Sequence, residues 1–191
     1  MNEKNYLALL HKIWLSHKKL HFIFKDNCNF SDFYNSISSD LLKKYCFTPK
    51  QIDLILNNKI KYNIAMIEKT LKSREVKVIT FFDINYPEIL KNIPNPPFLF
   101  YLRWKIDSSP KIAVVWSRNI TNYWKDIISD IVWPLSSYFT IVSWGAAWCD
   151  SFSHKIALNN ENTTISVIWT WIDVDYPINN KKLIYISKFF I

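Results

Sequence analysis

The chain of 191 residues contains a single glycine, Gly145, and nine tryptophans. Glycine accepts positive φ at turns and at the ends of helices without a steric penalty. Average usage of about 7% would place roughly 13 glycines in a chain of this length. A fold that alternates strands and helices needs several such positions, so the scarcity of glycine is the first feature that any structure has to explain.

The apolar patterns predict three successive parts. Residues 1–74 carry apolar side chains at helical spacing, which predicts a small all-helical domain. Residues 75–110 start as a strand and continue as a connector punctuated by prolines. Residues 111–191 alternate strand and helix patterns, which is typical of βαβ units and a parallel sheet. We therefore expect an α/β, Rossmann-like C-terminal domain.

The same patterns predict individual elements. Ser16 and Thr48 are expected to cap helices, with Pro49 in the first turn of the second one. The predicted helices cover 3–14, 16–25, 50–58, 61–75, 122–137 and 150–159, and the predicted strands cover 76–82, 112–115, 139–143 and 164–168.

Each of the last three strands runs into a loop that contains tryptophan. The loops read WSRNIT, SWGAAWCD and WTWIDVDYP. Six tryptophans lie in or just beyond them: Trp116, Trp124, Trp144, Trp148, Trp169 and Trp171. Open parallel sheets bind ligands at the carboxyl ends of their strands. With glycine at each tryptophan, these would be ordinary phosphate-cradling loops, in which backbone N–H groups and a helix N-terminus approach an anion.

With that replacement, residues 81–187 resemble the DNA-processing protein A family (DprA, also called Smf). Eight residues from Asp83 to Leu99 match the first motif of the family, D-x-x-Y-P-x-x-L-x-x-I-x-x-P-P-x-L. Three further motifs match at Ser117, Arg118, Thr121 and Tyr123; at Ser143, Ala146, Asp150, His154, Ala157 and Leu158; and at Thr164, Ile165, Val167, Asp173, Tyr176, Pro177 and Asn179. The family's glycines coincide with the six loop tryptophans and with Trp104.

We hypothesise that these tryptophans arise from codon reassignment. Some bacteria read the UGA codon as glycine, whereas a common alternative code reads it as tryptophan. Abundant Asn, Lys and Ile suggest an AT-rich gene, which is the setting where UGA is reassigned, and Gly145 would come from an ordinary glycine codon. The alternative is a divergent, tryptophan-rich relative that has lost its site. Indoles at glycine positions would obstruct an anion site, so the chain as written is expected to bind poorly.

The resemblance implies a set of phosphate-binding residues. They are Trp116, Ser117, Arg118, Thr121, Ser143, Trp144, Gly145, Ala146, Asn179 and Lys181, with the tryptophans in the family's glycine positions. Residues expected to shape the site are Tyr123, Trp148, Asp150, His154, Trp169, Trp171 and Tyr176. Arg118 is expected to bind phosphate, against the alternative of a solvated surface arginine. Thr121 could contact phosphate or cap the following helix. Ile178 stands where the family often has a basic residue, so Lys181 and Lys182 are the nearest substitutes.

Two pairs of residues, each four positions apart, raise the question of catalysis or metal binding. Asp150 and His154 could act in acid–base catalysis, but we favour a structural role because no nucleophile accompanies them. His17 and His21 lack the glutamate of a zinc-binding helix, so they are predicted to be exposed residues rather than metal ligands. No metal, cofactor or catalytic residue is expected.

Charge and cysteine content indicate which kind of partner and which cellular compartment to expect. The formal charge of +8 favours an anionic partner such as nucleic acid. Cys28, Cys46 and Cys149 are far apart and odd in number, which predicts reduced thiols in the cytoplasm. The N-terminus lacks the features of a signal peptide, no run is long enough to span a membrane, and no membrane partner is expected.

The resemblance implies a protein that binds single-stranded DNA, loads the RecA recombinase, and protects and processes incoming DNA during natural transformation. It implies no enzymatic activity. The family is expected to form homodimers, through an interface that would follow Ile191, because family members continue with further strands and helices. The chain is therefore expected to be a fragment or the product of a truncated gene. The alternatives are a lysine-decarboxylase-like nucleotide hydrolase, whose P-G-G-x-G-T loop is not visible here, and a nucleotide-sensing module.

Overall fold

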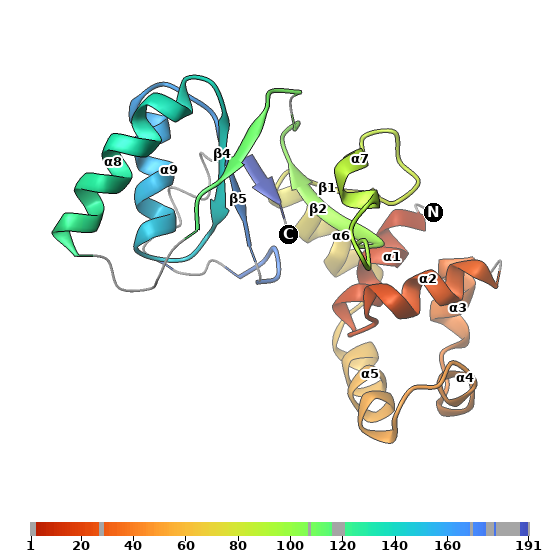
Figure 1. Ribbon diagram of the computed structural model, residues 1–191. Helices are drawn as coiled ribbons and strands as arrows, with labels where there is room; N and C mark the ends of the chain where they lie inside the picture. The colour runs from red at the N-terminus through yellow and green to blue at the C-terminus, as the bar shows by residue number, and fades with distance from the viewer. Residues whose placement is uncertain are drawn as a thin grey trace. The chain divides into compact units, whose positions relative to one another are not determined.

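The computed structural model describes residues 3–26, 29–106, 108–115, 121–168, 170–174, 178 and 188–190. Contacts within the chain divide it into two units, residues 1–100 and 101–191 (Figure 1). The division falls inside strand β2 (Leu99–Arg103), a strand that the sequence patterns did not predict. The three-part division at residues 74 and 110 remains a prediction. In the described part of the chain, no helix has the length and apolar character needed to cross a bilayer.

The N-terminal unit consists mainly of short helices, as the helical spacing predicts. Its elements are α1 (Glu3–Lys12), α2 (His17–Lys25), α3 (Phe30–Ser36), α4 (Ser39–Lys44), α5 (Pro49–Lys61), α6 (Ile64–Ser73), β1 (Val76–Thr80) and α7 (Glu88–Lys91). Strand β1 lies next to β2 in the sheet, and beyond β1 the Phe81 N–H donates to the Phe98 carbonyl at 2.9 Å.

Side chains close the starts of four of these helices. Thr48 accepts a hydrogen bond from the Gln51 N–H at 3.4 Å, and the Gln51 side chain accepts one from the Thr48 N–H at 2.9 Å. This reciprocal pair is a capping box. Asn29, Ser38 and Asn63 cap α3, α4 and α6 with their side-chain oxygens. The predicted cap at Thr48 is thus confirmed.

Other details of the N-terminal unit differ from the sequence patterns. The continuous pattern at 61–75 is broken, because Tyr62 is extended and ends α5 before Asn63 begins α6. Ser16 stands at the start of α2, but its side chain makes no capping bond. Helices α3 and α4 were not predicted, since segments of seven and six residues are too short to show a helical period.

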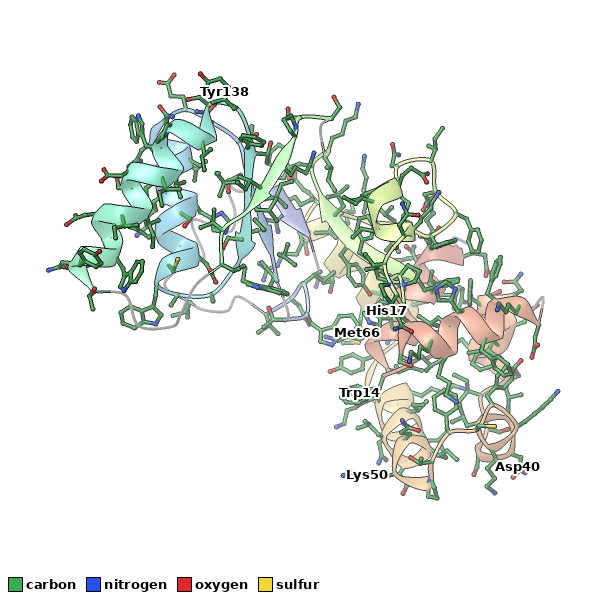
Figure 2. All side chains as sticks on the ribbon, in the orientation of Figure 1. Trp14, His17, Asp40, Lys50, Met66 and Tyr138 are labelled. Atoms are coloured by element: carbon green, nitrogen blue, oxygen red, sulfur yellow. The ribbon has the colours of Figure 1, made fainter. Side chains whose placement is uncertain are left out.

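The histidines of the N-terminal unit are half-buried, which corrects the prediction that His17 and His21 are exposed. The His21 ring packs edge-on against Phe98 with 4.6 Å between ring centroids, and its Nε2 lies 3.4 Å from the Pro96 carbonyl. The His11 and His17 rings (the latter labelled in Figure 2) lie 4.9 Å apart between centroids. Burial, together with the neighbouring His17, lowers the pKa of His11 to about 3. Helical spacing counts only apolar residues, so it missed this packing.

The C-terminal unit is built on a mixed but mainly parallel sheet. Its strands lie in the order β2, β6 (Lys188–Phe190), β5 (Thr164–Val167), β4 (Thr140–Trp144) and β3 (Lys111–Ala113). Strands β3, β4, β5 and β6 pair in parallel, and β2 pairs antiparallel with β6. The predicted α/β class and parallel sheet are confirmed.

Strands β2 and β6 lie outside the sequence prediction for physical reasons. All five residues of β2 are buried, so it shows none of the apolar–polar alternation of a half-exposed strand. It also begins only one residue after Pro96 and Pro97, and the prolines in this region made the whole segment look like a connector. Strand β6 has only three residues.

Helices α8 (Asn122–Ser136) and α9 (Cys149–Asn159) lie side by side and pack against β4 (Figure 1). The core between them is formed by Ile128, Val132, Ile141, Cys149, Ile156 and Ala157. This packing fixes where α9 begins relative to the end of β4. Cys149 is a buried free thiol in this core, and Cys46 is an exposed free thiol in the N-terminal unit.

Candidate functional site

Strands β3, β4 and β5 end at one edge of the sheet. They are parallel neighbours, with Ile112 opposite Ile141 and Val142 opposite Ile165. The loop of residues 145–148, called the β4–α9 loop below, leaves this edge and leads into α9. In an open parallel sheet, ligands bind at such an edge because the loops and helix starts gather there. Of the four residues predicted to form the second loop, Ser143 and Trp144 end β4, and Gly145 and Ala146 follow in the loop.

Gly145 is favoured by close packing rather than by its torsion angles, because its φ is not positive. A Cβ at this position would lie 3.0 Å from Cγ1 of Ile168 and 3.2 Å from Oγ of Ser166. The Gly145 N–H donates to the Val167 carbonyl at 2.9 Å and so fastens the loop to β5. A larger residue would require the Ile168 and Ser166 side chains to shift by a few tenths of an ångström.

Side chains of α9 hold the next part of the loop. The Ala146 N–H donates to the Asp150 carboxyl, and the Ser151 hydroxyl donates to the Ala146 carbonyl at 2.7 Å. The His154 Nε2 lies 3.2 Å from the Trp144 carbonyl. Side chains of α9 thus bond back to the end of β4 and to the loop that precedes the helix.

These hydrogen bonds limit which backbone N–H groups of the loop can contact a phosphate. The N–H groups of Gly145 and Ala146 already donate to acceptors inside the protein. A helix start also carries N–H groups that have no partner within the helix, here in the first turn of α9 from Cys149 onward. That turn is the helix N-terminus that the sequence analysis expected to approach an anion, and the phosphate-binding role of Gly145 and Ala146 stays a prediction.

Asp150 is buried beneath the β4–α9 loop. Its Oδ1 lies 2.9 Å from Oγ of Ser143, and the Ser143 hydroxyl also lies within hydrogen-bond distance of the Val114 carbonyl. Burial raises the pKa of Asp150, while the bonds from Ser143 and Ala146 act in the opposite direction. The Ser143 hydroxyl thus has two acceptors within reach, the Asp150 carboxyl and the Val114 carbonyl.

His154 joins the two central strands below the loop. Its Nδ1 lies 2.6 Å from Oγ1 of Thr164, and the Thr164 hydroxyl donates to the Ile141 carbonyl at 2.8 Å. Burial lowers the pKa of His154 to about 4, although the contact with the Trp144 carbonyl acts to raise it. The imidazole is therefore neutral at pH 7. Both it and Asp150 bond protein groups inside the fold, which is the geometry of a structural pair rather than of an exposed acid and base.

The remaining described residues of the predicted site lie at its margins. Thr121 is the N-cap of α8, and its hydroxyl accepts a hydrogen bond from the Trp124 N–H at 3.4 Å. Tyr123 is exposed, with its ring 5.5 Å from that of Trp124. Trp171 is half-buried, and its ring lies 5.9 Å from that of Tyr101. Thr121 thus has the capping role that the sequence allowed as an alternative to a phosphate contact.

Several predicted residues fall outside the part of the chain that the structure describes. They are Trp116, Ser117, Arg118, Trp169, Tyr176, Asn179 and Lys181. Their roles stay predictions, including those of the two basic side chains expected at the site. Within the described ranges, no group of three or more His, Cys, Asp or Glu residues is arranged to hold a metal ion.

Sequence reasoning missed the anchoring roles of Ser151 and Val167. Ser151 acts through its hydroxyl on a carbonyl five residues earlier, and Val167 acts through its own backbone carbonyl. A serine in the first turn of a helix is a weak signal because most such serines are solvated. A backbone acceptor leaves no signal in the sequence at all.

Comparison with known proteins identifies a family for more than half of the chain, from late in the N-terminal unit onward. The family model for DNA recombination-mediator protein A matches residues 77–187. Protein Smf of a Synechocystis species is 30% identical over 146 residues, which cover 72% of this chain and 36% of that protein. DNA processing protein DprA of Streptococcus pneumoniae is 35% identical over 106 residues, covering 54% of this chain and 38% of that one. The chain thus spans little more than a third of these relatives.

Solved structures show the same fold. The X-ray structure of DNA processing protein A from Streptococcus pneumoniae gives a TM-score of 0.72 at 23% identity, covering 97% of this chain and 66% of that one. A structure of DNA processing protein A from Helicobacter pylori, which concerns the single-stranded DNA binding mode of that protein, gives 0.51 at 24% identity and covers 61% and 54%. The predicted Rossmann-like fold is confirmed.

Proposed function

Because the chain belongs to the DNA recombination-mediator protein A family, we propose that its C-terminal unit binds single-stranded DNA at the edge where β3, β4 and β5 end. The proposal rests above all on the β4–α9 loop. This loop is held from both sides, by Val167 of β5 and by Asp150, Ser151 and His154 of α9. A loop that is already ordered loses little conformational freedom when a ligand binds.

The proposed contacts are with the DNA backbone rather than with the bases. The first turn of α9 offers N–H groups and the positive end of a helix dipole to a phosphate. Arg118 and Lys181 supply the expected charge, in line with the net charge of +8. Binding of this kind releases counterions, so its affinity falls as the salt concentration rises.

We favour binding over catalysis as the role of this site. Asp150 and His154, the pair best placed for acid–base chemistry, are buried and bonded to the protein. The nucleotide hydrolase and nucleotide-sensing alternatives have no comparable support from a described residue. We further propose that the full-length protein is a homodimer in the cytoplasm that hands DNA to RecA during natural transformation.

Fluorescence anisotropy with a labelled oligo-dT strand tests the proposed function. The chain should be measured as written and with glycine at positions 116, 124, 144, 148, 169 and 171, across a salt series. We expect the glycine-bearing chain to bind more tightly and its affinity to fall with salt. Arg118→Ala in that background should weaken binding roughly tenfold and reduce the salt slope by about 1.

The matched control is Lys50→Ala, which removes a positive charge from the exposed face of α5 (Figure 2). It should leave the affinity within about twofold, because the loss of one solvated charge outside the proposed site is largely screened. If the glycine-bearing chain fails to bind oligo-dT, or if Lys50→Ala weakens binding as much as Arg118→Ala, the proposed site is wrong. Release of free base from nucleoside monophosphates would favour the hydrolase instead.

A further inference from the structure

Among the described residues, seven that are not glycine have positive φ. They are Trp14 (91°), Cys46 (55°), Glu75 (54°), Asn95 (86°), Trp104 (69°), Trp148 (80°) and Glu161 (57°). Residues with a side chain normally reach the left-handed region only between about +50° and +70°. Three of the seven lie beyond that range, and asparagine is a residue type that tolerates it. The other two are Trp14 and Trp148.

Trp14 occupies the glycine position of a well-defined helix ending. Its N–H donates to the His11 carbonyl at 3.0 Å, and the N–H of Leu15 donates to the Leu10 carbonyl at 3.1 Å. This pair of bonds after α1 is the Schellman motif, with Trp14 at the position that glycine usually holds. The hydrophobic contact that accompanies the motif is expected between Leu10 and Leu15, and both are fully buried.

Two other helices end in the same motif and show the contrast. After α9, the Glu161 N–H donates to Leu158 and the Asn162 N–H donates to Ala157. Cys46 holds the equivalent position after α4. Both residues have φ near the value that an ordinary side chain accepts, whereas Trp14 departs from it by more than 30°. The motif itself therefore does not force φ to 91°.

Trp148 is the N-cap of α9 and has φ of 80° and ψ of −117°. These angles lie in the mirror image of the β region, which glycine alone enters freely. The residue makes no side-chain capping bond that would offset the strain. Nor does burial offset it, because the indoles of Trp148 and Trp14 are 57% and 62% exposed (Trp14 in Figure 2).

We propose that the natural polypeptide carries glycine at positions 14 and 148. Trp14 lies outside the segment that matches the family model, so its assignment rests on the backbone alone. The same substitution in both units means that the codon reading affects the whole gene rather than the loops of one site. At position 148, glycine would also uncover the first turn of α9.

Thermal unfolding of the full chain without DNA tests this inference apart from the proposed function. Trp14→Gly and Trp148→Gly should each raise Tm by roughly 2–4 °C, because each relieves a strained φ. Trp133→Gly is the matched control: Trp133 is similarly exposed, at 48%, but lies inside α8. It should lower Tm, because glycine destabilises a helix interior. Glu161→Gly should raise Tm less than Trp14→Gly does.

The gene and the native protein give a second readout. We expect UGA codons at positions 14 and 148, and peptides from the native source that are lighter by the difference between tryptophan and glycine. A UGG codon at either position overturns the inference for that position. So does a Trp14→Gly or Trp148→Gly variant that lowers Tm as much as Trp133→Gly does. None of these outcomes depends on whether the chain binds DNA.

Discussion

Helices α5 and α9, which belong to different units, start in different ways. In the N-terminal unit, α5 begins with a side-chain capping box between Thr48 and Gln51. In the C-terminal unit, α9 begins at Trp148, which contributes no side-chain bond and has a backbone conformation suited to glycine. There the order comes from α9 itself, through Asp150 and His154 reaching back to the loop.

The difference shows what each kind of helix start leaves available. A side-chain cap uses its oxygen on the N–H groups of the first turn, so little remains for a ligand. At a start without a side-chain cap, the cap residue places no side-chain acceptor on those N–H groups. The start of α5 is therefore closed by its own side chains, whereas the start of α9 has no side-chain cap.

Among the tests of this comparison, substitution of Asp150 is expected to have the largest effect on stability. Asp150→Ala leaves the Ser143 hydroxyl and the Ala146 N–H without this acceptor in a buried site, which should cost about 3 kcal/mol. Urea unfolding followed by tryptophan fluorescence measures it, since eight of the nine tryptophans lie in residues 101–191. Asp150→Asn keeps an acceptor and should lose less. Equal stability of the wild type and the alanine variant would show that the loop is not held by this residue.

Lowering the pH should reduce the stability of both units. Substitution of His154 isolates the pH dependence that comes from the C-terminal unit. Its pKa is about 4 in the folded chain against 6.5 ordinarily, so the unfolded chain binds more protons between these values. Stability that is fully present above pH 6.5 should therefore be lost as pH falls toward 4, by on the order of 2–3 kcal/mol. His154→Gln should flatten this dependence in fluorescence-detected unfolding. An unchanged pH profile in that variant would rule out His154 as its source.

A smaller effect is expected at the capping box of α5. Thr48→Ala removes the acceptor for the Gln51 N–H and should destabilise the N-terminal unit by about 1 kcal/mol. Far-UV circular dichroism suits this test, because most helices of the chain lie in that unit. Thr48→Ser keeps the hydroxyl and should retain most of the stability. If serine is no better than alanine, the effect comes from packing rather than from the cap.

The smallest effect is expected from a surface ion pair. Lys43 and Asp40 (the latter in Figure 2) lie 3.1 Å apart on α4, and both side chains are well exposed. Lys43→Ala should change the stability by less than about 0.5 kcal/mol, because water and salt screen such pairs. Denaturant midpoints in low and high salt provide the measurement. A loss comparable to that of Thr48→Ala would mean that charges, and not caps, stabilise the N-terminal helices.

The sequence predicted most of the fold of the C-terminal unit, where hydrophobic runs and helical spacing are strong. It missed β2, because a strand buried along its whole length looks like any apolar run among prolines. It missed α3 and α4 because they are short.

The candidate site could likewise be predicted only in part. The positions of Ser143, Gly145 and Asp150 at the carboxyl edge follow from the motifs. The acceptors that hold the loop do not, because the Val167 carbonyl belongs to the backbone and Thr164 meets His154 only in the folded chain.

The buried thiol of Cys149 follows the β4–α9 loop directly and lies in the core beneath α9. Burial raises its pKa, so both its protonation and its lack of access slow alkylation. Cys46 is exposed and should react at once. The rate at which Cys149 becomes alkylated therefore reports how often the start of α9 detaches from the sheet, and that rate can be followed by mass as DNA is added.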